Sequence, residues 1–161
     1  MKKLLLLLLF IPLMSFSQLS YNDLMSIRST DTFKKVTIEN GYEFDSADKD
    51  WITYGYNIAR DSINGNKSSS WSSYNSKDHR WSFQISRTDK LSTFLNTNPD
   101  NSNNWYDLIV KDIKEKCKYF KILAYDEIDY VTYSCSESSY KGKIGFAIKE
   151  GVGIIRHFPE E

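Results

Sequence analysis

Hydrophobic and polar positions alternate with two different periods along the chain, and these periods predict helices and strands. After residue 104 the apolar positions lie three or four residues apart, with lysine and acidic side chains between them. This spacing predicts an amphipathic helix whose buried stripe is Trp105, Ile109, Ile113, Cys117 and Phe120. A broken helix is expected over residues 21–40, because Ser20 and Asp23 form a capping pattern and residues 29–31 interrupt the apolar spacing.

Strands are predicted where β-branched and aromatic residues gather, or where apolar and polar residues alternate. Residues 81–86 alternate cleanly, and residues 51–58 combine tryptophan, tyrosine, isoleucine and threonine. Residues 71–74 form a short candidate strand, whereas residues 42–44 lead into a polar turn expected at 45–50. Four further strands are predicted at 121–125, 130–136, 142–149 and 152–158.

The predicted elements fall into two similar halves, residues 20–95 and 103–159, on either side of the asparagine-rich stretch 96–104. Residues 51–57 parallel residues 130–136, with Thr53 matching Thr132 and Tyr54 matching Tyr133. Such self-similarity can indicate a duplicated unit, although alternating aromatic residues and threonine are common in any strand. We therefore predict an α+β fold of two helix-plus-antiparallel-meander units that form one curved sheet with the helices packed on one face.

This arrangement resembles the tandem helix-plus-four-strand architecture of secreted proteins of the β-lactamase-inhibitor-protein class. The resemblance covers most of the chain after residue 17, and it implies a fold rather than an activity. The sequence contains no recognisable inhibitor motif, so no functional residue carries over from that class.

The first 17 residues have the composition of a secretory signal peptide. Lys2 and Lys3 precede an apolar run over residues 4–14, and Ser15 and Ser17 provide small residues before a cleavage site at Gln18. We expect residues 18–161 to form a single exported domain, periplasmic or extracellular, with no membrane span. The whole chain has 21 basic and 21 acidic residues, and this balance argues against a nucleic-acid partner.

The two cysteines, Cys117 and Cys135, are predicted to form a disulfide bond. An exported protein lies in a compartment where disulfides persist. Cys117 is on the apolar stripe of its predicted helix, and Cys135 has the same strand parity as Val131 and Tyr133. The alternative is a pair of buried free thiols that pack as small hydrophobic side chains.

Residues for catalysis or metal binding are harder to find. The two histidines are His79, between Asp78 and Arg80, and His157 near the C-terminus, and we expect both to be solvated or to lie on edge strands. No motif for a nucleophile, a phosphate or calcium is present, so we predict no catalytic residue, no metal and no cofactor. A hydrolase would require one of the histidines beside a carboxylate inside a cleft.

The remaining candidates are residues on the sheet face that the helices leave open. If Ile52, Tyr54, Tyr56, Val131, Tyr133 and Cys135 face the helices, the opposite face carries Trp51, Thr53, Tyr130 and Thr132. Aromatic side chains on an open face are typical of a binding surface, although they can also fold over the sheet edge.

These observations favour a monomeric, non-catalytic binding or inhibitory module whose sheet face contacts a macromolecule: a protein, a peptide or a glycan. The alternatives are a structural or accessory envelope protein and a hydrolase whose site has no recognisable motif. A continuous apolar patch on the helix-free face would favour the binding module over the structural protein.

Overall fold

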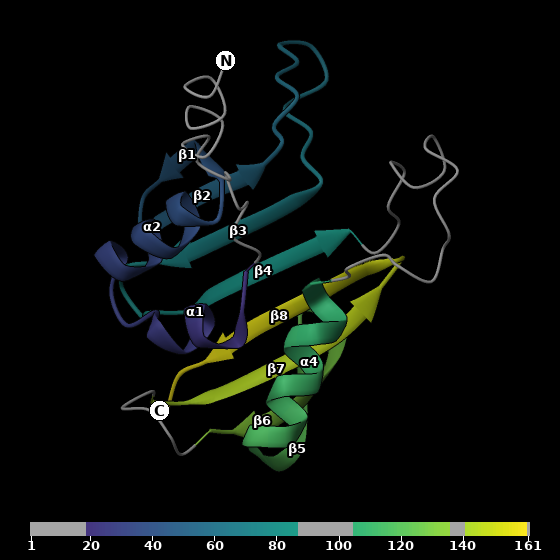
Figure 1. Ribbon diagram of the computed structural model, residues 1–161. Helices are drawn as coiled ribbons and strands as arrows, with labels where there is room; N and C mark the ends of the chain where they lie inside the picture. Colours follow the sequence, from purple (N-terminus) through teal and green to yellow (C-terminus); the bar gives the residue numbers. More distant parts are fainter. Residues whose placement is uncertain (1–18, 87–104, 136–140, 161) are drawn as a thin grey trace, which may run out of the picture.

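The computed structural model describes residues 19–86, 105–135 and 141–160, and shows three helices beside one eight-stranded antiparallel sheet (Figure 1). The strand order is β1-β2-β3-β4-β8-β7-β6-β5, so two consecutive four-stranded meanders meet along β4 and β8. The α+β fold expected from the sequence is therefore confirmed. The signal-peptide prediction and the loop predicted at 96–104 fall outside the described residues.

The first unit contains two short helices and four strands. Helix α1 spans Tyr21–Ser26 and α2 spans Thr30–Glu39, followed by β1 (Tyr42–Asp48), β2 (Trp51–Tyr56), β3 (Ser70–Asn75) and β4 (Trp81–Ser86). The expected break between the helices is confirmed, because Ser20 and Ser29 each begin a new helix with a complete capping box. Strand β1 is longer than predicted and includes residues 45–48, which we had expected in a turn.

The second unit repeats this order with one longer helix. Helix α4 spans Trp105–Lys116, followed by β5 (Lys118–Tyr125), β6 (Ile128–Ser134), β7 (Lys143–Lys149) and β8 (Val152–Phe158). The first strand pair of each unit contains an irregularity in register, between Phe44 and Ser46 in β1 and between Tyr119 and Lys121 in β5. The prediction that the helix stripe extends to Phe120 is wrong, since α4 ends at Lys116 and β5 begins two residues later.

All three helices cover the same face of the sheet (Figure 1). The main core lies between the two layers, where Phe33 of α2 and Ile109 and Ile113 of α4 meet Phe83 of β4 and Ile155 of β8. Phe83 and Ile155 are directly opposite each other in the register of the central strand pair. The seam between the two units is therefore part of the hydrophobic core, and burial of this apolar surface holds the two units together.

The approach of α4 to the sheet depends on a glycine. A Cβ atom at Gly153 would lie 2.5 Å from Cγ of Tyr106, so the Tyr106 ring occupies the place of a β8 side chain. The Tyr106 hydroxyl donates a hydrogen bond of 2.9 Å to the carbonyl oxygen of Ala147. Among the described residues, the helices are too short and too polar to cross a lipid bilayer.

Candidate functional site

Strand parity divides the sheet residues between two faces as the sequence predicted. Tyr54 of β2 packs edge-on against Phe33 of α2, with 5.9 Å between the ring centroids. Trp51 and Thr53 alternate with Tyr54 along β2 and therefore point away from the helices. We call this second surface the helix-free face, and its central residues are Trp51, Thr53, Gly55, Trp71, Ser73, Ser82, Gln84, Ile154, Arg156, Gly145, Ala147, Tyr130 and Thr132.

Tyr130 and Thr132 lie on the helix-free face but are buried there, so the expectation that they are open to a partner is wrong. Their exposed fractions are 1% and 0%. The ring of Phe158 meets the Tyr130 ring edge-on at 5.3 Å, and the Arg156 guanidinium lies 5.8 Å from the same ring. A Cβ atom at Gly145 would lie 2.7 Å from the Phe158 ring, so this glycine gives the ring room to lie across the sheet.

A small second core thus forms on the helix-free face of the C-terminal unit. Its members are Tyr130, Ala147 and Ile154, with Tyr125, Ile128, Val152 and Phe158 packed around them. Desolvation in this layer raises the pKa of the Tyr130 phenol. Because side chains of the sheet itself cover Tyr130, no third layer of secondary structure is needed to bury it.

Arginine side chains extend the cover over this second core. The Arg156 guanidinium lies 4.1 Å from the centroid of the Tyr125 ring, and Nη1 of Arg80 donates a 3.1 Å hydrogen bond to the Tyr125 hydroxyl. Asp126 lies 3.5 Å from Arg156 and partly neutralises it. The C-terminal half of the helix-free face is therefore a packed and charge-compensated layer.

The N-terminal half of the helix-free face is more open. Trp51 and Thr53 of β2 are half-buried, as are Trp71 and Ser73 of β3. A Cβ atom at Gly55 would lie 2.8 Å from Cζ3 of Trp71, so the indole ring lies over the glycine. Since Trp51 and Trp71 lie at opposite ends of the β2–β3 pairing, four residues apart in register, they are about 13 Å apart along the strands.

Trp71 is not among the binding residues predicted from the sequence. The pattern over Trp71–Tyr74 predicts a short strand, and its alternation puts Trp71 on the face opposite Tyr74. Its partnership with Trp51 depends on the β2–β3 register, in which Gly55 lies opposite Trp71. That register joins segments separated by a long loop, and local alternation does not specify it.

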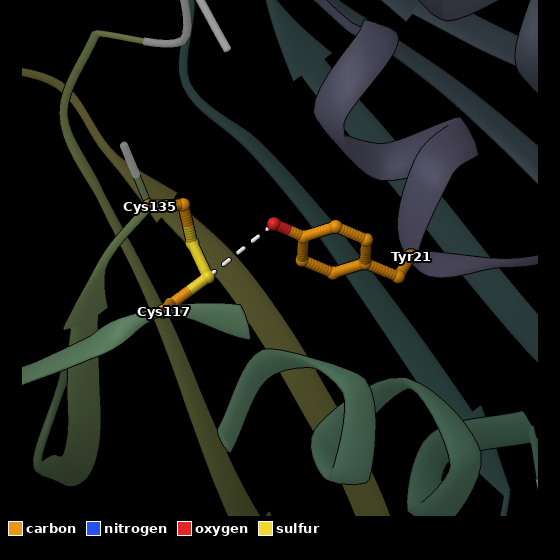
Figure 2. The surroundings of a disulfide bond; sticks show 3 residues. All are labelled: Tyr21, Cys117 and Cys135. Atoms are coloured by element: carbon orange, nitrogen blue, oxygen red, sulfur yellow. Dashed lines mark hydrogen bonds between the residues drawn. A yellow bond between two sulfur atoms is a disulfide. The ribbon is translucent and has the colours of Figure 1, made fainter. Parts of the chain in front are cut away.

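The predicted disulfide bond between Cys117 and Cys135 is present (Figure 2). Cys117 follows the last residue of α4 rather than lying on the helix stripe, and its backbone N–H donates to the carbonyl of Ile113. The Tyr21 hydroxyl of α1 lies 3.4 Å from Sγ of Cys117. The bond therefore ties the end of α4 to the end of β6, directly beneath α1.

The two histidines come together at the end of the sheet where β3 turns into β4. Asn75 shapes this turn, because its side-chain oxygen accepts hydrogen bonds from the backbone N–H groups of Lys77 and Asp78. His79 follows with a left-handed backbone angle of 59°, and its Nδ1 lies 2.7 Å from the Tyr74 hydroxyl. His79 and His157 line a pocket of about 400 Å³ together with Asp78 and Glu160. For His157, the prediction of a solvated or edge-strand residue is wrong.

His157 is held in place by two backbone carbonyl groups. Its Nε2 lies 2.8 Å from the carbonyl oxygen of Lys141, and its Nδ1 lies 3.0 Å from that of His79. A neutral imidazole has one N–H group, so only the doubly protonated ring can donate to both carbonyls. Burial of the ring lowers the pKa of His157, and the two carbonyl acceptors oppose this effect.

This pocket contains the residue types that a hydrolase would need, but in the part of the chain that the structure describes no hydrogen bond joins Asp78 to either histidine. Both ring nitrogens of His157 face carbonyl groups, so neither is oriented toward a nucleophile. Oδ2 of Asp78 accepts a 2.7 Å hydrogen bond from Nε of Arg80, which holds the pKa of this carboxyl below its usual value. No group of three or more metal-ligating side chains occurs in the described segments.

Comparisons with protein-family models, curated proteins and solved structures gave no match. The architectural resemblance to the β-lactamase-inhibitor-protein class stays a prediction.

Proposed function

We propose that this protein is an exported, non-catalytic binding module whose helix-free face contacts a macromolecular partner. The contact surface is the N-terminal half of that face, where Trp51 and Trp71 flank Thr53 and Ser73. The observation that carries the proposal is the position of Trp71, whose indole ring lies over Gly55. A ring supported by backbone in this way loses little side-chain entropy when a partner stacks on it.

The chemical character of the surface supports a macromolecule rather than a small substrate. The two tryptophans are about 13 Å apart along the strands, with the hydroxyl groups of Thr53 and Ser73 between them. Tryptophans are enriched among the residues that supply most of the binding energy at interfaces, and the hydroxyl groups between them can donate and accept hydrogen bonds. This spacing suits an extended peptide, a protein surface or a glycan chain.

The proposal is tested by comparing capture of partners by wild-type protein and by the Trp51→Ala/Trp71→Ala variant, each immobilised through a C-terminal tag. Extracellular and envelope fractions of the native host provide the partners, which are identified and quantified by mass spectrometry. We expect the double variant to remain folded and to lose the partner that the wild-type protein enriches.

A matched control removes similar exposed apolar surface from the helical side. Ile38 and Leu108 are exposed residues on α2 and α4, and the Ile38→Ala/Leu108→Ala variant should keep full capture. Equal capture by the wild-type protein and the tryptophan variant would contradict the proposed surface. Loss of capture in the control variant alone would assign the contact to the helices instead.

A further inference from the structure

The pocket at the β3–β4 end of the sheet is separate from the surface of Trp51 and Trp71. Its walls come from the connection between α1 and α2, the β3–β4 turn, the residues just before β7 and the residues just after β8. Its volume of about 400 Å³ lies within the usual range for small-molecule sites. The segments that form it are far apart in the sequence, so the pocket exists only in the folded protein.

Four charged side chains line this pocket, two acidic and two basic. Each of the two acidic side chains already has a basic partner: Asp78 is bound by Arg80, and Glu160 lies 3.6 Å from Lys143. The other two charged lining residues are Arg28 and Lys141. Within the described ranges, no carboxylate lies within 4 Å of the Arg28 guanidinium or the Lys141 ammonium group. Among the residues that the structure describes, the exposed side chains of Arg28 and Lys141 therefore have no salt-bridge partner.

The backbone that carries Lys141 is fixed by buried contacts. The His157 ring is 6% exposed, its nitrogens lie 2.8 Å from the carbonyl oxygen of Lys141 and 3.0 Å from that of His79, and it stacks on Trp81 at 5.7 Å. Gly142 has a φ of 118°, and a Cβ atom there would lie 2.6 Å from Nε2 of His157. Only glycine fits both the angle and the space, so any other residue at this position would strain the backbone beside Lys141. A site that is already ordered loses little entropy when a ligand binds.

The lining also contains an apolar part. Ile27, at the end of α1, and Pro159, just after β8, both contribute to the pocket wall. A ligand that combines an anionic group with a compact apolar group would match the unpaired cations and these two side chains.

We propose that this pocket binds a small organic carboxylate, with Arg28 and Lys141 contacting the carboxylate and Ile27 and Pro159 contacting the apolar group. His157 is a positioning residue in this site, since its ring nitrogens face the carbonyl groups of Lys141 and His79 rather than the ligand. The assignment is independent of the macromolecular surface, because its residues come from different elements.

Benzoate and benzamide are suitable probes because they have nearly the same shape and differ in charge. Binding is measured by isothermal titration calorimetry and by backbone amide shifts of Lys141, Gly142 and His79 in NMR spectra. We expect benzoate to bind at millimolar or lower concentration and benzamide to bind at least about tenfold more weakly. Inorganic phosphate should also bind more weakly than benzoate, because it cannot use the apolar wall.

Charge-removing variants test the named residues. Arg28→Gln and Lys141→Gln should each weaken benzoate binding roughly tenfold, as expected for loss of one charge-assisted hydrogen bond. Lys149→Gln is the matched control, since Lys149 is an exposed lysine at the other end of β7 and should leave binding unchanged. Equal binding of benzoate and benzamide, phosphate binding as tight as benzoate binding, or unchanged binding in both pocket variants would overturn the proposal.

Discussion

The disulfide bond between Cys117 and Cys135 allows the most quantitative prediction. The two cysteines are 18 positions apart in the sequence. In the chain-entropy model, closing a loop of this length removes about 11 cal/mol/K from the unfolded chain, or about 3 kcal/mol at 25 °C. We therefore expect the Cys117→Ala/Cys135→Ala variant to lose about 3 kcal/mol of unfolding free energy. For a domain of this size, the corresponding fall in Tm is about 6–12 °C.

The assay is urea unfolding followed by circular dichroism, with the wild-type protein measured both oxidised and in the presence of reductant. Reduced wild-type protein and the double variant should have similar midpoints, both lower than that of the oxidised protein. Tyr21→Phe is a useful comparison, because it removes the hydroxyl group that lies 3.4 Å from Sγ while leaving the disulfide bond in place, and should cost less than about 1 kcal/mol. A loss below about 1 kcal/mol in the double variant would refute the reasoning, because the crosslink would then not constrain the unfolded chain.

Two further predictions concern side chains whose burial the structure revealed. Tyr130→Ala should destabilise the protein by about 3 kcal/mol, as expected for a buried aromatic residue, whereas Trp51→Ala should change stability by less than about 1 kcal/mol. Equal effects of these two substitutions in urea unfolding would contradict the division of the helix-free face into a packed half and an open half. His157 should make stability depend on pH. Burial lowers its pKa in the folded protein below the unfolded value of about 6.5. As the pH falls, the unfolded chain therefore binds more protons at this site than the folded protein does. The free energy of unfolding should therefore decrease as the pH falls below about 6.5. His157→Gln should remove this pH dependence, and the control His79→Gln should keep it. A pH dependence that persists in His157→Gln would assign the effect to another group.

Features that depend on nearby residues could be predicted from the sequence. The helix break at Ser29 follows from a capping pattern of four consecutive residues, and α4 follows from apolar spacing within a single segment. The alternation along β2 and β6 correctly divided Tyr54 from Thr53 and Tyr133 from Thr132, because the side-chain period of a strand is two residues. Parity also brought Cys117 and Cys135 to the same layer, although the helix ends one residue before Cys117.

The exposure of those side chains was decided by the tertiary structure. Strand parity placed Tyr130 of β6 on the helix-free face. In the folded protein, Phe158 and Arg156 of β8 reach across Gly145 of β7 and cover the Tyr130 ring. Strands β6, β7 and β8 are brought together only by the folded sheet. In the same way, His157 and His79 lie 78 positions apart in the sequence. No local pattern indicates that the His157 ring lies within hydrogen-bond distance of the His79 carbonyl oxygen. Sequence periodicity specifies the direction in which a side chain points, whereas burial depends on which distant residues pack over it. The faces of the β2 and β6 residues were thus determined by the sequence alone, and the open tryptophan surface and the histidine pocket were determined by long-range packing.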